Sequence, residues 1–232
     1  MVARLVPGFT QSGSSWGAVT ALLTADTELL DVPEAVDFVA AAHALASDRS
    51  TYVGYSQGGR LCLQLALDRP EVVHKLVLVS ASPGIADAAE RAVRRDADER
   101  LAREIERGGV DAFLERWLAQ PLFATLPRER SGIDERKRVN TIEHLTYQLR
   151  VLGQGVQPSN WDRLGELAMP VLLIAGELDT KYVAVAKRMA EQIADARVEI
   201  VPGAGHACHL EQPEHVAQLL ASFEADGSDE AE

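Results

Sequence analysis

Short apolar runs alternate with helical patterns along most of the chain, and this alternation restricts the fold more than any other feature. Six runs rich in Val, Ile and Leu have the length and composition of buried strands, and they cover residues 3–6, 28–32, 51–53, 75–79, 171–175 and 198–201. Helical periodicity follows several of them, at residues 32–45, 57–67 and 183–193. Strands that alternate with helices form βαβ units, whose strands run parallel. The sequence therefore predicts an α/β fold with a mostly parallel, doubly wound sheet.

The alternation is interrupted once, where charged helical patterns replace strands. This interruption predicts an inserted helical cap at residues 83–158, between a first part of the α/β core at 1–82 and a second part at 159–224. A short acidic segment at 225–232 follows the last helical pattern, and its composition predicts a disordered tail.

Two helices of the predicted cap carry arginines able to face inward. The first has an apolar stripe at steps of four, formed by Val93, Ala97, Leu101 and Ile105. This stripe leaves Arg94 on the flank of the helix, where it can turn toward the interior. The second has a stripe formed by Ile142, Leu145 and Leu149. Arg138 continues that stripe at the start of the helix, as a charged residue at an apolar position.

Charge and cysteine content exclude several classes of partner. The formal net charge of -12 argues against a nucleic-acid partner, because phosphate binding needs a basic face. The two cysteines, Cys62 and Cys208, are too few for a disulfide framework and favour a reducing, cytoplasmic location. No segment has the roughly 20 apolar residues needed to cross a bilayer. These features predict a cytoplasmic protein with neither a nucleic-acid nor a membrane partner. A monomer or a homodimer is expected.

The segment Gly54-Tyr55-Ser56-Gln57-Gly58 matches the pattern Gly-x-Ser-x-Gly. The match alone is weak, but it follows an apolar strand and opens a helical run, which is the setting of a nucleophile elbow. Glycines on both sides allow strand and helix to approach closely. A serine that merely caps a helix is the alternative. The pattern predicts Ser56 as the reactive hydroxyl.

A serine hydroxyl needs a base, and the base needs an acid that orients it. Asp179 and His206 each lie just beyond a predicted strand and follow Ser56 in the order acid, then histidine. Both are therefore expected at the carboxyl ends of strands, where ligands bind in such sheets. Glu177 is the competing acid. We expect structural roles for His43, His74 and His144, and an exposed position for His215.

The oxyanion hole is expected to use two backbone N–H groups. One belongs to Gln57, directly after the serine, and the second to Phe9, in the loop after the first strand. His206, Cys208 and His209 lie close together but lack the further ligands that a zinc site requires. The stretches Gly153-Gln154-Gly155 and Gly203-Ala204-Gly205 lack the third glycine of a dinucleotide site. No metal and no cofactor are predicted.

These motifs resemble a known family, the 2-succinyl-6-hydroxy-2,4-cyclohexadiene-1-carboxylate synthases of menaquinone biosynthesis, which have the α/β-hydrolase fold. The resemblance runs over most of the chain. It rests on Pro7-Gly8-Phe9-Thr10, Gly54-Tyr55-Ser56-Gln57-Gly58-Gly59-Arg60, Glu90-Arg91-Ala92-Val93-Arg94, Trp117 with Gln120-Pro121-Leu122-Phe123, Arg138-Val139-Asn140, Gly155-Val156-Gln157-Pro158, Gly176-Glu177-Leu178-Asp179-Thr180-Lys181 and Gly205-His206.

The resemblance implies a role for each candidate residue. Ser56, Asp179 and His206 would form a catalytic triad. A polycarboxylate substrate would be held by Arg60, Arg94 and Arg138, in a pocket that Tyr55 and Trp117 line. The implied reaction is a lyase step, in which the serine removes a proton next to the succinyl ketone and pyruvate is eliminated.

Two departures from the family pattern and two rival functions stay open at this point. The first loop begins with Pro7 where the family usually has histidine, and Asp31-Val32-Pro33 leads directly into a predicted helix without the usual Gly-His-Gly loop. One rival is a hydrolase of esters or carbon–carbon bonds on the same scaffold. The other is a ligand-binding member of the fold without catalytic activity.

Overall fold

The computed structural model describes residues 2–226, so the predicted tail lies outside the described residues from position 227 onward. Six strands form one sheet in the order β2-β1-β3-β4-β5-β6, and every neighbouring pair is parallel. The strands are β1 (Ala3–Val6), β2 (Thr27–Leu29), β3 (Ser50–Tyr55), β4 (Val73–Val79), β5 (Val171–Gly176) and β6 (Ala196–Val201). The predicted parallel sheet is confirmed.

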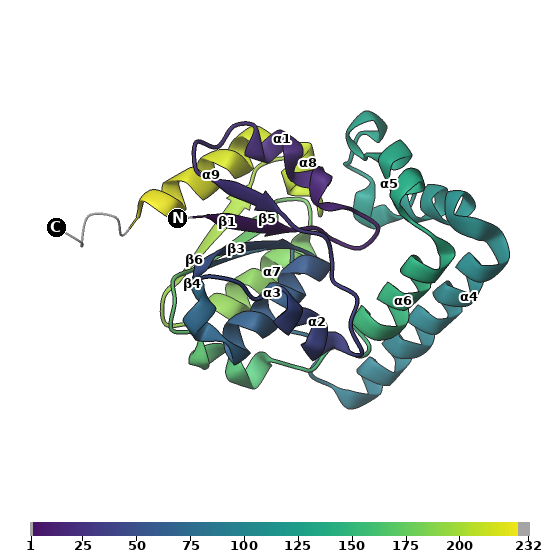
Figure 1. The fold of residues 1–232 in the computed structure, drawn as a ribbon, viewed down its shortest axis with the longest axis horizontal. Coiled ribbons are helices and arrows are strands. Elements are labelled where there is room, and N and C mark those ends of the chain that lie inside the picture. Colours follow the sequence, from purple (N-terminus) through teal and green to yellow (C-terminus); the bar gives the residue numbers. More distant parts are fainter. Residues whose placement is uncertain (1, 227–232) are drawn as a thin grey trace.

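Helices cover both faces of this sheet (Figure 1). One face packs on α2 (Phe38–Ala44), α3 (Gln57–Asp68) and α7 (Thr180–Ala190). The opposite face packs on α1 (Gly17–Thr20), α8 (Cys208–Glu211) and α9 (Pro213–Ala225). Successive strand residues alternate between the two apolar clusters, as the pleat of a strand requires. The doubly wound arrangement is therefore confirmed.

Helix α2 begins later than the sequence pattern predicts. The structure has Asp31-Val32-Pro33 in a loop, and the helix starts only at Phe38. The side chain of Asp37 accepts a hydrogen bond from the backbone N–H of Ala40, and this cap fixes the start of the helix. The expectation that the chain runs straight from Pro33 into a helix was wrong, because Asp37 supplies the capping oxygen four residues later.

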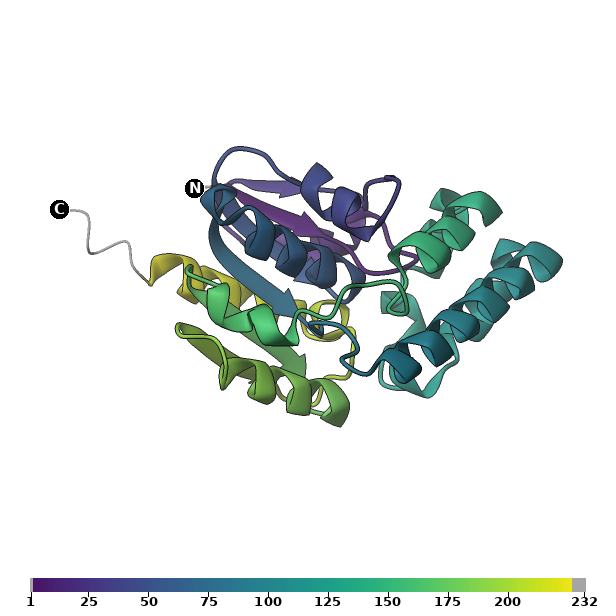
Figure 2. The ribbon, with the colours of Figure 1, turned by 90° about the horizontal axis from the view of Figure 1, so that it is seen from below.

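The inserted segment has three helical elements, with short 3-10 turns between the first and the second, and the first is kinked at Gly109, where φ is 77° and ψ is 170°. The three elements are α4 (Ala88–Leu118), α5 (Ile133–Val139) and α6 (Ile142–Leu152). Their apolar side chains form a separate cluster against which Phe9 and Trp117 pack. Figures 1 and 2 show these helices beyond the carboxyl ends of the strands. The domain boundaries at 83 and 158 remain predictions.

Helices α5 and α6 are distinct, with Asn140 and Thr141 between them. The Thr141 side chain caps α6 by accepting a hydrogen bond from the backbone N–H of His144. Asn140 donates from Nδ2 to the carbonyl oxygens of Thr10 and Arg136, each at 2.8 Å. The apolar stripe of α6 therefore does not continue into α5. Among residues 2–226, no helix is long and apolar enough to span a bilayer.

Candidate functional site

Ser56 lies in the sharp turn between β3 and α3, with φ 49° and ψ -105°. A positive φ is rare for a residue with a side chain, and it indicates a turn that the surrounding structure enforces. A Cβ on Gly54 would overlap the Cα of Gly59, and a Cβ on Gly58 would lie 2.5 Å from the carbonyl oxygen of Pro7. Glycine at both positions lets the elbow bring the serine hydroxyl into the cavity.

We expect Gly54→Ala to destabilise the protein by more than about 2 kcal/mol, because the new methyl group meets backbone atoms that cannot move aside. The urea unfolding midpoint measures this effect. Gly17→Ala is the matched control, since Gly17 has φ -55° and a Cβ added there would meet no other atom within 4 Å. The control should be neutral or slightly stabilising. Equal midpoints for the two variants would contradict the close approach at the elbow.

The structure brings Ser56, His206 and Asp179 into one hydrogen-bonded chain. His206 Nδ1 lies 2.6 Å from Asp179 Oδ2, and His206 Nε2 lies 3.3 Å from Ser56 Oγ. Because a carboxylate can only accept, the ring proton lies on Nδ1 and leaves Nε2 free to accept the serine proton. The competing acid, Glu177, accepts instead from the backbone N–H of Gly203. This geometry can generate a basic serine oxygen.

Aromatic rings surround His206. The ring centroid of Tyr182 lies 4.7 Å from that of His206, Tyr55 lies at 5.4 Å and Phe123 at 6.1 Å. His206 is itself buried. Burial behind aromatic groups keeps water from the imidazole and strengthens its hydrogen bonds.

Phe9 and Gln57 both line the same cavity as Ser56. Gln57 is the first residue of α3, so its N–H has no partner within the helix. For the N–H of Phe9 the structure shows no acceptor within residues 2–226, whereas the N–H of Gly8 is held by the side chain of Gln11. Two donors are thus available near Ser56. Their use as an oxyanion hole remains a prediction.

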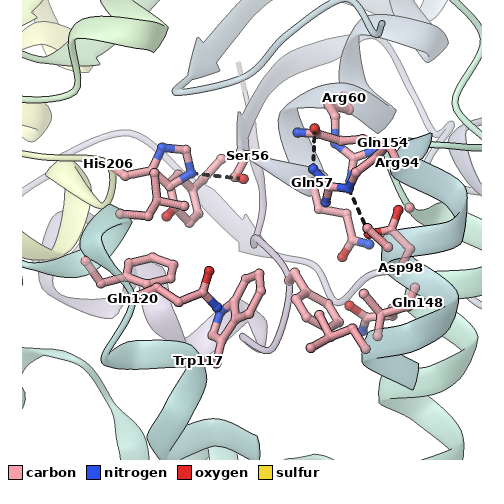
Figure 3. A pocket seen from close by; sticks show the side chains of 18 of the residues that line it. Ser56, Gln57, Arg60, Arg94, Asp98, Trp117, Gln120, Gln148, Gln154 and His206 are labelled. Carbon is pink, nitrogen blue, oxygen red and sulfur yellow. Dashed lines mark hydrogen bonds and ion pairs between the residues drawn. The ribbon is translucent and has the colours of Figure 1, made fainter. Parts of the chain in front are cut away.

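The cavity has a volume of about 580 Å³ and lies between the sheet and the inserted helices. Ser56 and His206 lie on one side of it, and Arg60, Arg94 and Gln154 lie on the other (Figure 3). Tyr55 and Trp117 line it, as the resemblance implies, and Phe9 packs against Trp117 with ring centroids 5.1 Å apart. The cavity therefore offers one end suited to proton transfer and another suited to anion binding.

Two arginines that line the cavity, Arg60 and Arg136, are buried without a carboxylate partner. Arg60 is 5% exposed and donates from Nη1 to the carbonyl oxygen of Leu152 at 3.0 Å and to Gln157 Oε1 at 3.2 Å. Burial lowers its pKa to about 10. Neither arginine forms an ion pair with an acidic side chain in the part of the chain that the structure describes.

Arg136 comes from α5 and is 4% exposed. It donates from Nε to the carbonyl oxygen of Ser131 and from Nη1 to Thr10 Oγ1, so only neutral oxygens contact it. Burial lowers its pKa to about 10. Buried charges are normally paired, because desolvation costs several kcal/mol per ion. Arg60 and Arg136 together therefore indicate a cavity built to receive negative charge.

Arg94 lies at the same end of the cavity as Arg60 (Figure 3) and is partly exposed. Its Nε donates to Asp98 Oδ1 at 2.8 Å, and its Nη1 donates to Gln154 Oε1 at 2.7 Å. Gln154 in turn donates from Nε2 to the hydroxyl of Tyr182. These bonds fix the guanidinium and leave its Nη2 edge without a protein acceptor within residues 2–226. Arg94 lines the cavity, as predicted, but the predicted apolar stripe was partly wrong, because Val93 is 66% exposed and the buried residues of this part of α4 are Asp98, Ala102 and Ile105.

Arg138 does not reach the cavity, and the expectation that it faces inward was wrong. Its side chain is 72% exposed and forms an ion pair with Glu135 on the same helix. The stripe of α6 cannot be extended to Arg138, because α5 begins independently at Ile133. Within α5, the buried residues Ile133 and Arg136 lie on one face at a spacing of three. That spacing after Gly132 was the signal that could have identified Arg136.

The remaining histidines and cysteines lie outside the serine–histidine contact. His43 pairs with Asp68, and His144 contacts Glu34. His209 is fully buried between the rings of Trp16 and Tyr55, and burial holds its pKa well below the usual range. Residues 2–226 contain no group of three potential metal-ligating side chains.

Comparisons with known proteins point to one superfamily. The model of the alpha/beta hydrolase family matches residues 5–219. A putative 2-succinyl-6-hydroxy-2,4-cyclohexadiene-1-carboxylate synthase of Bacillus subtilis (strain 168) is 39% identical over 175 residues, which are 74% of this chain and 64% of that protein. The synthase of Salmonella paratyphi B is 32% identical over 172 residues, which are 74% and 66% of the two chains. The chain thus spans just under two thirds of the length of these relatives.

Solved structures agree with this assignment of the fold. The structure of MenH from S. aureus superposes with a TM-score of 0.88 at 27% identity and covers 96% of this chain and 92% of that one. A thermophilic esterase from Thermogutta terrifontis superposes with a TM-score of 0.79 at 21% identity, over 97% and 89% of the two chains. The second likeness concerns the fold alone.

Proposed function

Because this chain belongs to the alpha/beta hydrolase family, we propose that it uses the scaffold as a lyase, a 2-succinyl-6-hydroxy-2,4-cyclohexadiene-1-carboxylate synthase. It would eliminate pyruvate from 2-succinyl-5-enolpyruvyl-6-hydroxy-3-cyclohexene-1-carboxylate in menaquinone biosynthesis. The names of the Bacillus and Salmonella relatives support the proposal. The single observation that carries it is the pair of buried, unpaired arginines in the cavity.

The proposed substrate carries three carboxylates, one each on the succinyl, enolpyruvyl and ring positions. Arg60 and Arg136 are buried without an anionic partner, and Arg94 keeps one edge free beside Arg60. Carboxylates that bind there would offset the cost of burying the cations, and planar guanidinium groups hold carboxylates through paired hydrogen bonds. Arg60, Arg94 and Arg136 therefore orient the substrate, and Tyr55 and Trp117 pack against its ring.

The reaction starts at Ser56. His206 accepts the serine proton at Nε2 while Asp179 holds the imidazole by Nδ1 and stabilises the imidazolium. The serine oxygen then removes the proton α to the succinyl ketone, and the resulting enolate oxygen accepts hydrogen bonds from the N–H groups of Phe9 and Gln57. The electrons shift through the ring double bond, the diene forms, and the enolpyruvyl group leaves with its oxygen. The proton held by His206 returns to the leaving group, which becomes pyruvate.

A hydrolase that attacks an ester is the alternative function on this scaffold. It would use the same serine, histidine and aspartate, and the acyl group would bind covalently to Ser56. A neutral ester gives no reason to bury two cations in the walls of this cavity. The arginines therefore favour proton abstraction over acyl transfer.

The decisive experiment supplies purified protein with the enolpyruvyl precursor and follows pyruvate. We expect release at a rate well above buffer, with ester hydrolysis negligible by comparison. A fluorophosphonate probe should label Ser56, which a ligand-binding protein without catalytic activity would not permit. Pyruvate at the buffer rate, together with rapid hydrolysis of a simple ester, would refute the synthase and favour the hydrolase.

A cytoplasmic location is part of the proposal, as is a monomer or homodimer. Cys62 and Cys208 are free and buried in the structure. Burial raises the pKa of the Cys208 thiol to about 12. Unreactive buried thiols fit a reducing compartment.

A further inference from the structure

The loop that carries His206 is held by one side chain that the proposed mechanism does not use. Glu211, at the end of α8, folds back over this loop. Its Oε2 accepts a hydrogen bond from the backbone N–H of Gly205 at 2.8 Å, and its Oε1 accepts from the backbone N–H of Ala207 at 3.2 Å. The carboxylate therefore contacts the peptide groups on both sides of His206.

The carboxylate of Glu211 is buried and has no cationic partner. The residue is 7% exposed, and no Lys, Arg or His forms an ion pair with it within residues 2–226. Arg130 lies close by, but it donates to the backbone carbonyl oxygen of Glu211. An isolated buried carboxylate costs several kcal/mol, of which two N–H donors recover only a part. An apolar side chain at this position would stabilise the folded protein more than the carboxylate does. The carboxylate must therefore have a role other than stability.

The position of the loop determines the distance between His206 Nε2 and Ser56 Oγ. Asp179 fixes the direction of the imidazole, but the 3.3 Å between His206 Nε2 and Ser56 Oγ is already near the upper limit for proton transfer. A small displacement of the backbone at His206 would break this contact. Steric contact restrains the loop as well, since a Cβ on Gly205 would overlap Thr125 Oγ1.

We propose that Glu211 is a positioning residue for His206, which holds the histidine loop by accepting hydrogen bonds from both flanking N–H groups. Both carboxylate oxygens are needed, because only an ionised carboxylate offers two acceptors and no donor. Glutamine has nearly the same shape but turns an NH₂ group toward one of the two N–H groups. In Glu211→Gln the side-chain volume is therefore preserved, but a side-chain donor faces one of the two backbone N–H donors and that hydrogen bond is lost.

The kinetic test rests on the proposed function, and a labelling test does not. For Glu211→Gln we expect kcat for pyruvate release to fall by about 10- to 100-fold, because misplacement of a catalytic group by a fraction of an ångström has effects of this size. KM should stay within about twofold, since Arg60, Arg94 and Arg136 are untouched. The rate at which a fluorophosphonate labels Ser56 should fall in parallel. Glu214→Gln, at an exposed position on α9, is the matched control and should match wild type.

The outcomes separate the two proposals. If the wild-type protein releases no pyruvate, the synthase proposal fails. If Glu211→Gln is then still labelled more slowly than wild type, the positioning role of Glu211 is supported. Labelling and kcat within twofold of wild type, or a raised KM with unchanged kcat, overturn the positioning role. If Glu211→Gln does not fold, Glu211→Asp decides the question: it keeps the charge but is one methylene too short to reach both N–H groups, so a folded Glu211→Asp with wild-type labelling also overturns the role.

Discussion

Ser56→Ala is expected to lower kcat for pyruvate release by at least about 10³-fold, because removal of a positioned base costs factors of this order. The variant keeps the three cavity arginines, so the substrate should bind with an affinity close to that of wild type. Pyruvate release coupled to NADH oxidation measures the rate, and calorimetric titration measures substrate binding to the inactive variant. The alanine removes only one oxygen atom, and the fold should persist.

The same variant distinguishes a base from an acylated nucleophile. With wild-type enzyme under turnover, mass spectrometry should find no covalent adduct on Ser56, because proton abstraction needs none. A stable adduct, or a Ser56→Ala protein that keeps a tenth or more of the wild-type rate, would contradict the role given to this oxygen. His206→Ala should resemble Ser56→Ala, since groups that act as a unit lose their effect together.

Arg136→Met is expected to lower kcat/KM by about 10²- to 10³-fold, because loss of a buried charge contact to a carboxylate costs roughly 2–5 kcal/mol. The stability of the free protein should change by less than about 1 kcal/mol. Methionine loses the hydrogen bonds to Ser131 and Thr10, but it also removes the cost of a buried cation without a partner. Activity and urea unfolding, measured on the same preparation, report the two effects.

Arg138→Met is the matched control, two residues away on the same helix. Arg138 is exposed and pairs with Glu135, and exposed ion pairs contribute only about 0.2–1 kcal/mol. We expect kcat/KM within twofold of wild type. If instead Arg138→Met abolished activity and Arg136→Met did not, Arg138 would bind the substrate, as the sequence pattern predicts. The role given to Arg136 would then be refuted.

Much of the fold could be read from the sequence because buried parallel strands require continuous apolar runs. Each of the six predicted runs overlaps an observed strand, and α3 begins at Gln57 as predicted. The elbow around Ser56 is equally local, since two glycines and the strand-to-helix turn lie within five residues. Asp179 and His206 lie in the loops after β5 and β6, so the parallel sheet brings them to the same edge.

The tertiary structure decided which arginine enters the cavity and where the histidine loop is held. The direction of a side chain on a helix depends on where that helix begins, and contacts from distant parts of the chain determine this. Asn140 bonds to Thr10 at the break between α5 and α6, and Arg136 turns toward the same residue. Glu211 likewise reaches back across the loop that carries His206. Periodicity within one segment carries no information about such contacts, whereas apolar runs and tight turns are determined by neighbouring residues.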